Sequence, residues 1–221
     1  MTEAKVVTLR SIVLYAVGSP FAAEVEETCR RLGVTIAAAV KNIAGDHFLL
    51  DASVVREAAD IGTSLLQTPC IVPLFTPANR EYAVREAMAR GFTIAPALID
   101  PTAIVASSTA MGAGGYVNAG AVIGAAGRIG AHVFVNRSSS VGHHAELDDL
   151  VSIGPGVSIA GLVRVGRGAL IGAGATVLPK IEIGAECIVS AGAVVTRNVP
   201  DRSTVAGNPA KIVGKALPRG R

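Results

Sequence analysis

The chain has 221 residues, of which 50% are hydrophobic and only 17% are charged. This length and this composition fit one or two domains with a substantial core, and they exclude a disordered chain. The formal net charge is +3, and neither a basic run nor interleaved aromatic residues accompany it, so we expect no binding to nucleic acid.

The cysteines and the N-terminal segment indicate a cytoplasmic protein. Cys29, Cys70 and Cys187 are widely spaced without a CxxC motif, which favours reduced thiols that serve as packing residues. The first ten residues lack the apolar core of a signal peptide, so we expect no export. Residues 101–127 carry no charge, but six glycines interrupt them, so we expect no membrane-spanning helix there.

The first part of the chain comprises residues 1–97. Its first predicted element is a strand at residues 11–16 (SIVLYA). A helix with the sequence FAAEVEETCRRL follows. Ser19 is a suitable N-cap for it, Pro20 a suitable first helical residue, and Gly33 a suitable end.

Two further strands are predicted at residues 34–40 and 70–75, and two further helices from Asp51 and from Thr76 to Gly91. Strands that alternate with helices in this way are typical of a parallel sheet. We therefore expect a small Rossmann-like domain over this part of the chain.

A ligand of such a sheet binds beyond the carboxyl ends of the strands, where the loop AVGSPF (residues 16–21) joins the first strand to its helix. Gly18 and Ser19 are the candidate binding residues of this loop. The loop has one glycine, and Pro20 removes a backbone donor, so a nucleotide site and a plain structural turn both remain open.

From Leu98 onward the chain repeats every six residues. One position of the repeat is aliphatic seventeen times in succession without an insertion, from Ile99 to Val195. A helix has a period of about 3.6 residues and a strand a period of about 2, so neither explains the pattern. Short strands joined by tight turns would give triangular coils of eighteen residues. We therefore expect residues 98–221 to form a parallel β-helix of five to six coils followed by a tail.

In such a coil, residues eighteen apart should stack at the inter-strand distance of ~4.8 Å. Two series of polar residues have this spacing: Arg128, Glu146, Arg164 and Glu182, which alternate in charge, and Asp100, Asn118 and Asn136. We expect both series to form ladders on the surface of the solenoid.

Four segments carry a resemblance to a known family: the pair Asn79 and Arg80, residues 91–105 (GFTIAPALIDPTAIV), residues 134–143 (FVNRSSSVGH) and residues 205–211 (VAGNPAK). With the hexapeptides, they resemble the left-handed β-helix sugar acyltransferases, which include sugar-nucleotide N-acetyltransferases and sialic acid O-acetyltransferases. The resemblance implies a left-handed coil, a homotrimer with active sites between subunits, and acetyl-CoA as co-substrate. It also implies that the front domain holds a sugar nucleotide, with Asn79 among the binding residues.

Acyl transfer from a thioester needs a base for the nucleophile's proton and donors for the developing oxyanion. A neutral imidazole suits the first task near pH 7. The resemblance places His143 at the position of the catalytic base and Gly161 at the oxyanion position one coil above. Asn136, seven residues before His143, and His144 are the further candidate catalytic residues. For coenzyme A it implies contacts with Gly172, Ala173, Pro209 and Lys211.

The chain departs from the family pattern at two positions. The junction histidine of the relatives is Asp100 here, and the acid that many relatives carry after the catalytic histidine is His144. His144 either orients His143 or is a polar residue at a coil corner. Trimers resembling γ-type carbonic anhydrases bind zinc through three histidines. Adjacent histidines on an extended chain point apart, and His47 and His132 lack a matching spacing, so we expect no metal.

The sequence thus predicts an acetyl-CoA-dependent N-acetyltransferase acting on a nucleotide-linked amino sugar. The same base could serve a hydroxyl group, so O-acetylation of a sugar of the sialic acid type is the alternative. A non-enzymatic trimeric scaffold is a further alternative, because a solenoid can persist without chemistry.

Overall fold

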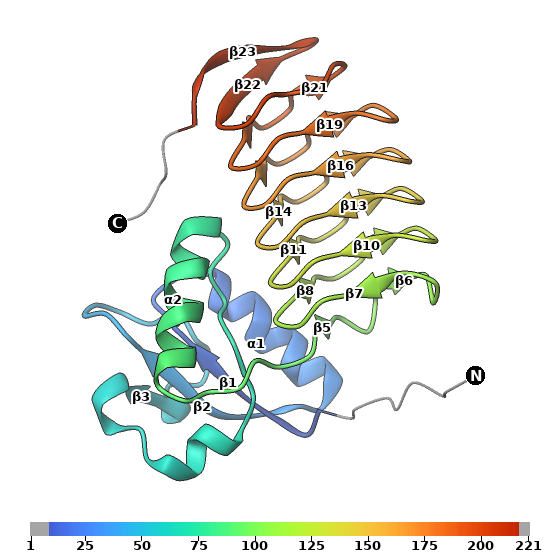
Figure 1. Cartoon of the computed structure of the whole chain (residues 1–221). Coiled ribbons are helices and arrows are strands. Elements are labelled where there is room, and N and C mark those ends of the chain that lie inside the picture. Colours follow the sequence, from blue (N-terminus) through green and yellow to red (C-terminus); the bar gives the residue numbers. More distant parts are fainter. Residues whose placement is uncertain (1–8, 217–221) are drawn as a thin grey trace.

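The computed structural model describes residues 9–216 in two parts, a front α/β part and a β-helix (Figure 1). The predicted ends of the two domains, residues 1–8 and 217–221, lie outside the described residues, as does most of the segment used to judge export. The sheet of the front part is parallel, as predicted, and its strands have the order β3-β2-β1-β4. Its strands are β1 (Ser11–Tyr15), β2 (Thr35–Lys41), β3 (Val55–Glu57) and β4 (Cys70–Ile71).

Two helices cover opposite faces of this sheet: α1 (Phe21–Leu32) and α2 (Pro77–Ala89). Successive residues of β1 alternate between the two faces, as in any strand, so Ile12 and Leu14 pack in the core that includes α1, and Val13 and Tyr15 in the core that includes α2. The α1 side also contains residues of the β-helix, so α1 lies at the junction of the two parts.

The start of α1 differs from the prediction by one residue. Pro20, not Ser19, is the residue before the first helical turn, although the Ser19 hydroxyl still accepts the Phe21 N–H at 3.3 Å. Gly33 ends the helix in the left-handed region, with φ 67°, as expected for a glycine C-cap.

The prediction of a helix from Asp51 is wrong. The segment forms three short 3-10 turns, η1 (Ala52–Val54), η2 (Ala58–Asp60) and η3 (Thr63–Gln67), with β3 between the first two. The Asp51 carboxylate accepts the Ser53 N–H at 2.9 Å, so it caps only one turn. Val55 is β-branched and favours extended chain, and it begins β3, which pairs with β2 and forms one edge of the sheet.

The β-helix contains seventeen strands of two residues, and each ends at the aliphatic residue that the repeat predicted. The strands stack into three parallel sheets. The domain-facing sheet contains β5 (Leu98–Ile99), β8 (Tyr116–Val117), β11 (Phe134–Val135), β14 (Ser152–Ile153), β17 (Leu170–Ile171) and β20 (Ile188–Val189). The uncharged sheet contains β6 (Ile104–Val105), β9 (Val122–Ile123), β12 (Ser140–Val141), β15 (Ser158–Ile159), β18 (Thr176–Val177) and β21 (Val194–Val195). The charged sheet contains β7 (Ala110–Met111), β10 (Arg128–Ile129), β13 (Glu146–Leu147), β16 (Arg164–Val165) and β19 (Glu182–Ile183).

Three edges join these sheets, and we name them in chain order. The chain passes from the domain-facing to the uncharged sheet at the first edge, from the uncharged to the charged sheet at the second edge, and back to the domain-facing sheet at the third edge. Corner residues such as Ala126, Ser138 and His144 adopt positive φ near 55°, which turns the chain sharply between strands.

The predicted register of eighteen is confirmed, because Arg128 pairs with Glu146 and Glu146 with Arg164 in neighbouring strands. The charged ladder is also confirmed, with 2.5 Å between Arg128 Nη2 and Glu146 Oε2 and 3.6 Å between Arg164 Nη1 and Glu182 Oε1. The top coil differs: Val199 pairs with Ile183, so the last corner is two residues shorter. An antiparallel hairpin of β22 (Ser203–Gly207) and β23 (Ala210–Lys215) covers the top.

The second ladder does not lie on the surface as expected. Asp100, Asn118 and Asn136 are buried at the first edge, beneath α1. Thr28 of α1 donates its hydroxyl to Asp100 at 3.1 Å. Burial alone would raise the pKa of Asp100, but hydrogen bonds from Thr102 and Thr28 and the charge of Arg31 outweigh it and hold this pKa below its usual value.

Arg80 of α2 joins the front part to the β-helix. Its guanidinium is fully buried, lies 4.3 Å from the centre of the Phe134 ring, and donates to carbonyl groups of both parts, among them Leu74 at 2.6 Å and Leu150 at 2.8 Å. Burial lowers the pKa of Arg80 to about 9, so the side chain stays charged at neutral pH. Arg80, the second residue of the family motif Asn79–Arg80, therefore has a structural role, because it connects the front part to the β-helix.

Candidate functional site

A cavity of 880 Å³ opens at the carboxyl ends of the front strands and brings together the three predicted acceptor residues, Gly18, Ser19 and Asn79. This size is in the range of small-molecule sites. Asn42 and Glu86 also line it, and Asn42 Nδ2 donates to Glu86 Oε2 at 2.8 Å.

The lining also includes three residues that were not predicted from the sequence: Asn42, Tyr82 and Glu86. Two signals could have found them. Asn42 directly follows β2, at the same edge of the sheet as the loop after β1. Asn79, Tyr82 and Glu86 are spaced by three and four residues, which puts them on one face of α2.

His143 lies at the second edge, between β12 and β13, and is exposed. Its ring covers Gly161, one coil above: a Cβ atom on Gly161 would lie only 2.6 Å from His143 Nε2. Within residues 9–216, the Gly161 N–H has no hydrogen-bond acceptor. The edge therefore holds an imidazole nitrogen beside a free backbone donor, which is the pair of groups that acyl transfer requires.

His144 does not point away from His143, contrary to the expectation for an extended chain. His144 is a corner residue with φ 55°, and a coil corner was one of the two alternatives predicted for it. This turn of the backbone brings the His144 ring close to the His143 ring. The two Nδ1 atoms are 3.0 Å apart, and the ring planes cross at 87°.

The other predicted residues lie elsewhere in the chain. Asn136 is at the first edge, where its amide oxygen accepts from Asn118 at 3.0 Å and from the Arg137 N–H at 2.8 Å. Gly172 and Ala173 lie at the same edge, two coils higher. Pro209 and Lys211 belong to the exposed hairpin at the top. A single chain therefore does not bring these residues to His143.

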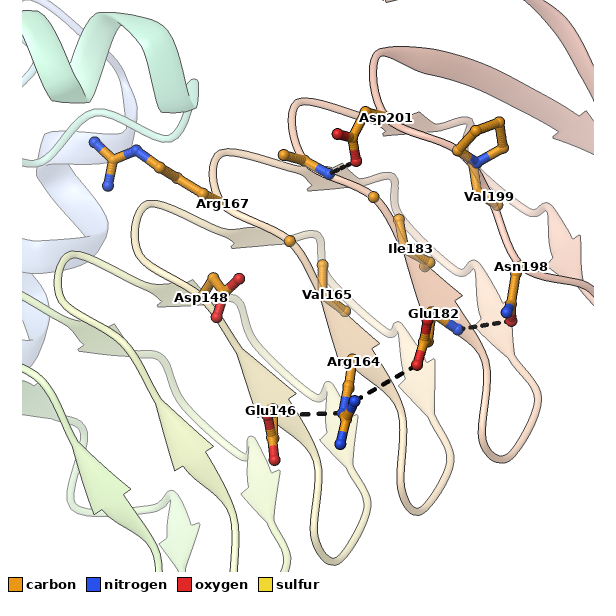
Figure 2. A pocket seen from close by; sticks show the side chains of 14 residues that line it. Glu146, Asp148, Arg164, Val165, Arg167, Glu182, Ile183, Asn198, Val199 and Asp201 are labelled. Atoms are coloured by element: carbon orange, nitrogen blue, oxygen red, sulfur yellow. Dashed lines mark hydrogen bonds and ion pairs between the residues drawn. The ribbon is translucent and has the colours of Figure 1, made fainter.

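The charged sheet carries a second, shallower cavity of 640 Å³, shown in Figure 2. Glu146, Arg164 and Glu182 lie in a row along its floor, and Asp201 accepts the Ala185 N–H at 2.8 Å. Glu146, Arg164 and Glu182 bond to one another, so the floor of this cavity presents paired charges.

The described residues contain neither a metal-binding cluster nor a membrane-spanning helix. No group of three or more His, Cys, Asp or Glu side chains that could hold a metal ion occurs in residues 9–216. No helix in the same part of the chain combines the length and the apolar content needed to cross a membrane.

Comparisons with known proteins agree with this geometry. A sequence model of the bacterial transferase hexapeptide family (six repeats) matches residues 163–197. A histidine-to-asparagine variant of perosamine N-acetyltransferase from Caulobacter crescentus, in complex with CoA and GDP-perosamine, is 31% identical with a TM-score of 0.79, covering 93% of this chain and 97% of that chain. The acetyltransferase domain of PglB from Neisseria gonorrhoeae, in complex with acetyl coenzyme A, is 31% identical with a TM-score of 0.80, covering 93% and 100%.

A third structure, WeeI from Acinetobacter baumannii, is 24% identical with a TM-score of 0.77, covering 93% of this chain and 100% of that chain, and shows the fold alone. The comparison with curated proteins gave no match. Fold and site together define a transferase with a left-handed β-helix. The chain belongs to the hexapeptide-repeat sugar acyltransferases, and the resemblance seen in the sequence is confirmed.

Proposed function

We propose that the protein is a cytoplasmic acetyl-CoA-dependent N-acetyltransferase that acts on the amino group of a nucleotide-linked amino sugar. The observation that carries the proposal is the contact of His143 Nε2 with Gly161 at the second edge. The similar enzyme from Caulobacter crescentus is a perosamine N-acetyltransferase in complex with CoA and GDP-perosamine. Free, buried cysteines support a reducing compartment.

In the proposed mechanism, His143 Nε2 takes a proton from the acceptor amine while the amine nitrogen attacks the thioester carbonyl carbon. The Gly161 N–H donates a hydrogen bond to the oxyanion of the tetrahedral intermediate. The intermediate then collapses, the carbon–sulfur bond breaks, and the coenzyme A thiolate receives the proton from His143. The products are an N-acetyl sugar and the free thiol.

The proposed site requires a second copy of the chain. The acceptor cavity, Asn136, Gly172 and Ala173 lie on the front part or the first edge, whereas His143 lies on the second edge. In the trimer that the family resemblance implies, the first edge of one copy would contact the second edge of the next, head to tail.

The uncharged sheet lies between these two edges and suits the contact between copies. Its outward residues carry no charge: Ile104, Val122, Ser140, Ser158, Thr176 and Val194. Ile104 and Val122 are 65% and 41% exposed in the single chain, so apolar surface remains to be buried there. We therefore propose the homotrimer that the family resemblance implies.

Coenzyme A would run up the second edge from His143. Two cations stand above His143 on this edge: Lys180, two coils higher, and Arg197, at the top corner. Both are exposed, and neither side chain bonds to another of the described residues. The first edge of the next copy would supply Gly172 and Ala173 from the other side, and Pro209 and Lys211 lie at the height of the nucleotide end.

The test is release of thiol from acetyl-CoA by the purified protein. The acceptors are UDP-, GDP- and dTDP-linked amino sugars and sialic acid, and the His143→Ala variant runs alongside. We expect release that depends on an amino-sugar nucleotide and that falls about 100-fold or more in the variant. Release of thiol with sialic acid alone would identify an O-acetyltransferase. If no acceptor gives release of thiol, the proposal is contradicted and the protein is a scaffold.

A further inference from the structure

The contact between the two histidines constrains where their protons lie. The Nδ1 atoms are 3.0 Å apart, which is a hydrogen-bond distance between ring nitrogens. A neutral imidazole carries one N–H and one bare nitrogen, so a bond between two neutral rings contains one proton. Two bare nitrogens would repel each other, and so would two N–H groups.

Two arrangements of this proton are possible, and they differ in what His143 can do. If His144 donates, His143 carries its own proton on Nε2, the nitrogen that faces Gly161. It then has no lone pair at the proposed reaction centre. If His143 donates from Nδ1, its Nε2 is bare and can accept a proton there.

We infer that His144 is the positioning residue for His143: its Nδ1 accepts the His143 Nδ1–H and holds His143 in the tautomer with a bare Nε2 beside Gly161. The inference rests on the proposed function, since it assigns His143 as the base. It is carried by the left-handed backbone of His144, with φ 55°, which turns the second ring onto the first. His144 therefore does here what an acid could do in the relatives.

A neutral acceptor differs from a carboxylate in one respect. One added proton anywhere on the histidine pair removes the bare Nε2, and no negative charge stabilises the imidazolium that forms. Glu146 is the carboxylate nearest in sequence, and it is engaged by Arg128 and by Arg164, at 2.5 and 3.8 Å. No ion pair of either histidine occurs among residues 9–216.

The kinetic test compares two substitutions at one position. His144→Phe keeps an aromatic ring and removes the acceptor, so we expect kcat to fall about tenfold to a hundredfold with little change in KM. His144→Glu supplies a charged acceptor, so we expect kcat within roughly fivefold of the wild type. It should also move the acid limb of the kcat/KM profile to higher pH, because a carboxylate stabilises the imidazolium.

The matched control is Glu186→Phe, which puts the same ring at a left-handed corner with φ 56° on the third edge. It should leave the kinetics unchanged. If His144→Phe keeps the wild-type rate and pH profile, or if His144→Glu is as slow as His144→Phe, the inference is wrong.

A spectroscopic readout keeps the inference separate from the proposed function. Imidazole ¹⁵N shifts of the wild-type protein distinguish a protonated Nδ1 from a protonated Nε2, and they need no substrate. We expect His143 to carry its proton on Nδ1, and His144→Phe to change this tautomer. A His143 proton on Nε2 would overturn the inference even in an active enzyme, whereas an inactive wild type would overturn only the proposed acetyl transfer.

Discussion

Gly161 has no side chain at the place where the His143 ring lies. The ring is so close that a Cβ atom would be 2.6 Å from Nε2 and 2.7 Å from Cε1. Real Cβ atoms do not approach other atoms this closely, so any larger residue must displace the imidazole. The glycine therefore serves the proposed reaction twice, through its free N–H and through the space that it leaves.

We expect Gly161→Ala to lower kcat about 100-fold, because a base displaced by about 1 Å loses its alignment with the acceptor. The N–H is still present in this variant, so the loss would report the position of His143. The measurement is steady-state kinetics beside thermal unfolding. Gly214→Ala is the control, since a Cβ there would meet nothing within 4 Å. A Gly161→Ala enzyme with the wild-type kcat would show that the observed position of His143 is not the reactive one.

The sequence could predict that His143 and Gly161 are neighbours, because a spacing of eighteen is one coil. It could not predict the bond between His143 and His144. Adjacent residues point apart only on an extended chain, and nothing in HHAEL shows that the second histidine has positive φ. Six of the corners with this backbone are glycine, from Gly114 to Gly192, but others hold Leu150, Lys180 and Glu186, so the type of a single residue does not reveal it.

Among the elements, the hexapeptide strands agree with the prediction from the sequence, whereas the segment after β2 does not. Each hexapeptide strand is set by a local pattern that recurs in the next coil, so every coil supports the assignment of its neighbours. The segment from Asp51 has one capping residue and no repeat. Its conformation is decided by tertiary contacts, such as the bonds of Glu26 on α1 to the N–H groups of Leu50 and Asp51, at 2.6 and 2.9 Å.

The cations on the second edge lead to a prediction about the binding of the acetyl donor, acetyl-CoA. At ~4.8 Å per coil, Lys180 and Arg197 stand roughly 10 and 14 Å above His143. The pantetheine arm of coenzyme A has the length of about four extended residues, roughly 13 Å. A thioester at His143 therefore places the diphosphate near these two cations, which have no other bonding partner among the described side chains.

We expect Lys180→Ala and Arg197→Ala each to raise the KM for acetyl-CoA roughly fivefold to tenfold, and to leave the KM for the sugar nucleotide unchanged. The effect should shrink at high salt, because exposed charges are screened. Arg202→Ala is the control, since Arg202 is also exposed but lies at the third edge, paired with Glu186 at 3.0 Å. An unchanged KM in the double variant would place coenzyme A on a different path.

At the scale of the whole molecule, the proposed site residues separate into two groups. Spacing along the chain could separate the residues by edge, but it does not say which sheet of the prism the front part covers, so the sequence did not show that the two groups lie apart. The three sheets resolve this: the front part covers one sheet, and His143 lies on the edge opposite to that sheet. In the proposed trimer, the cavity that would hold the sugar and the histidine that would deprotonate it would therefore meet between copies.

This arrangement predicts that two inactive variants restore activity to each other. His143→Ala damages the second edge and leaves the cavity intact, whereas Ser19→Trp fills the cavity and leaves the second edge intact. The two chains are expressed together with different tags, and trimers that contain both are purified. Any mixed ring of three has one junction that joins an intact cavity to an intact histidine, so we expect on the order of one third of the wild-type rate. If each site lay within one chain, every site in the mixed ring would carry a defect, and the mixed trimers would be as inactive as the parents.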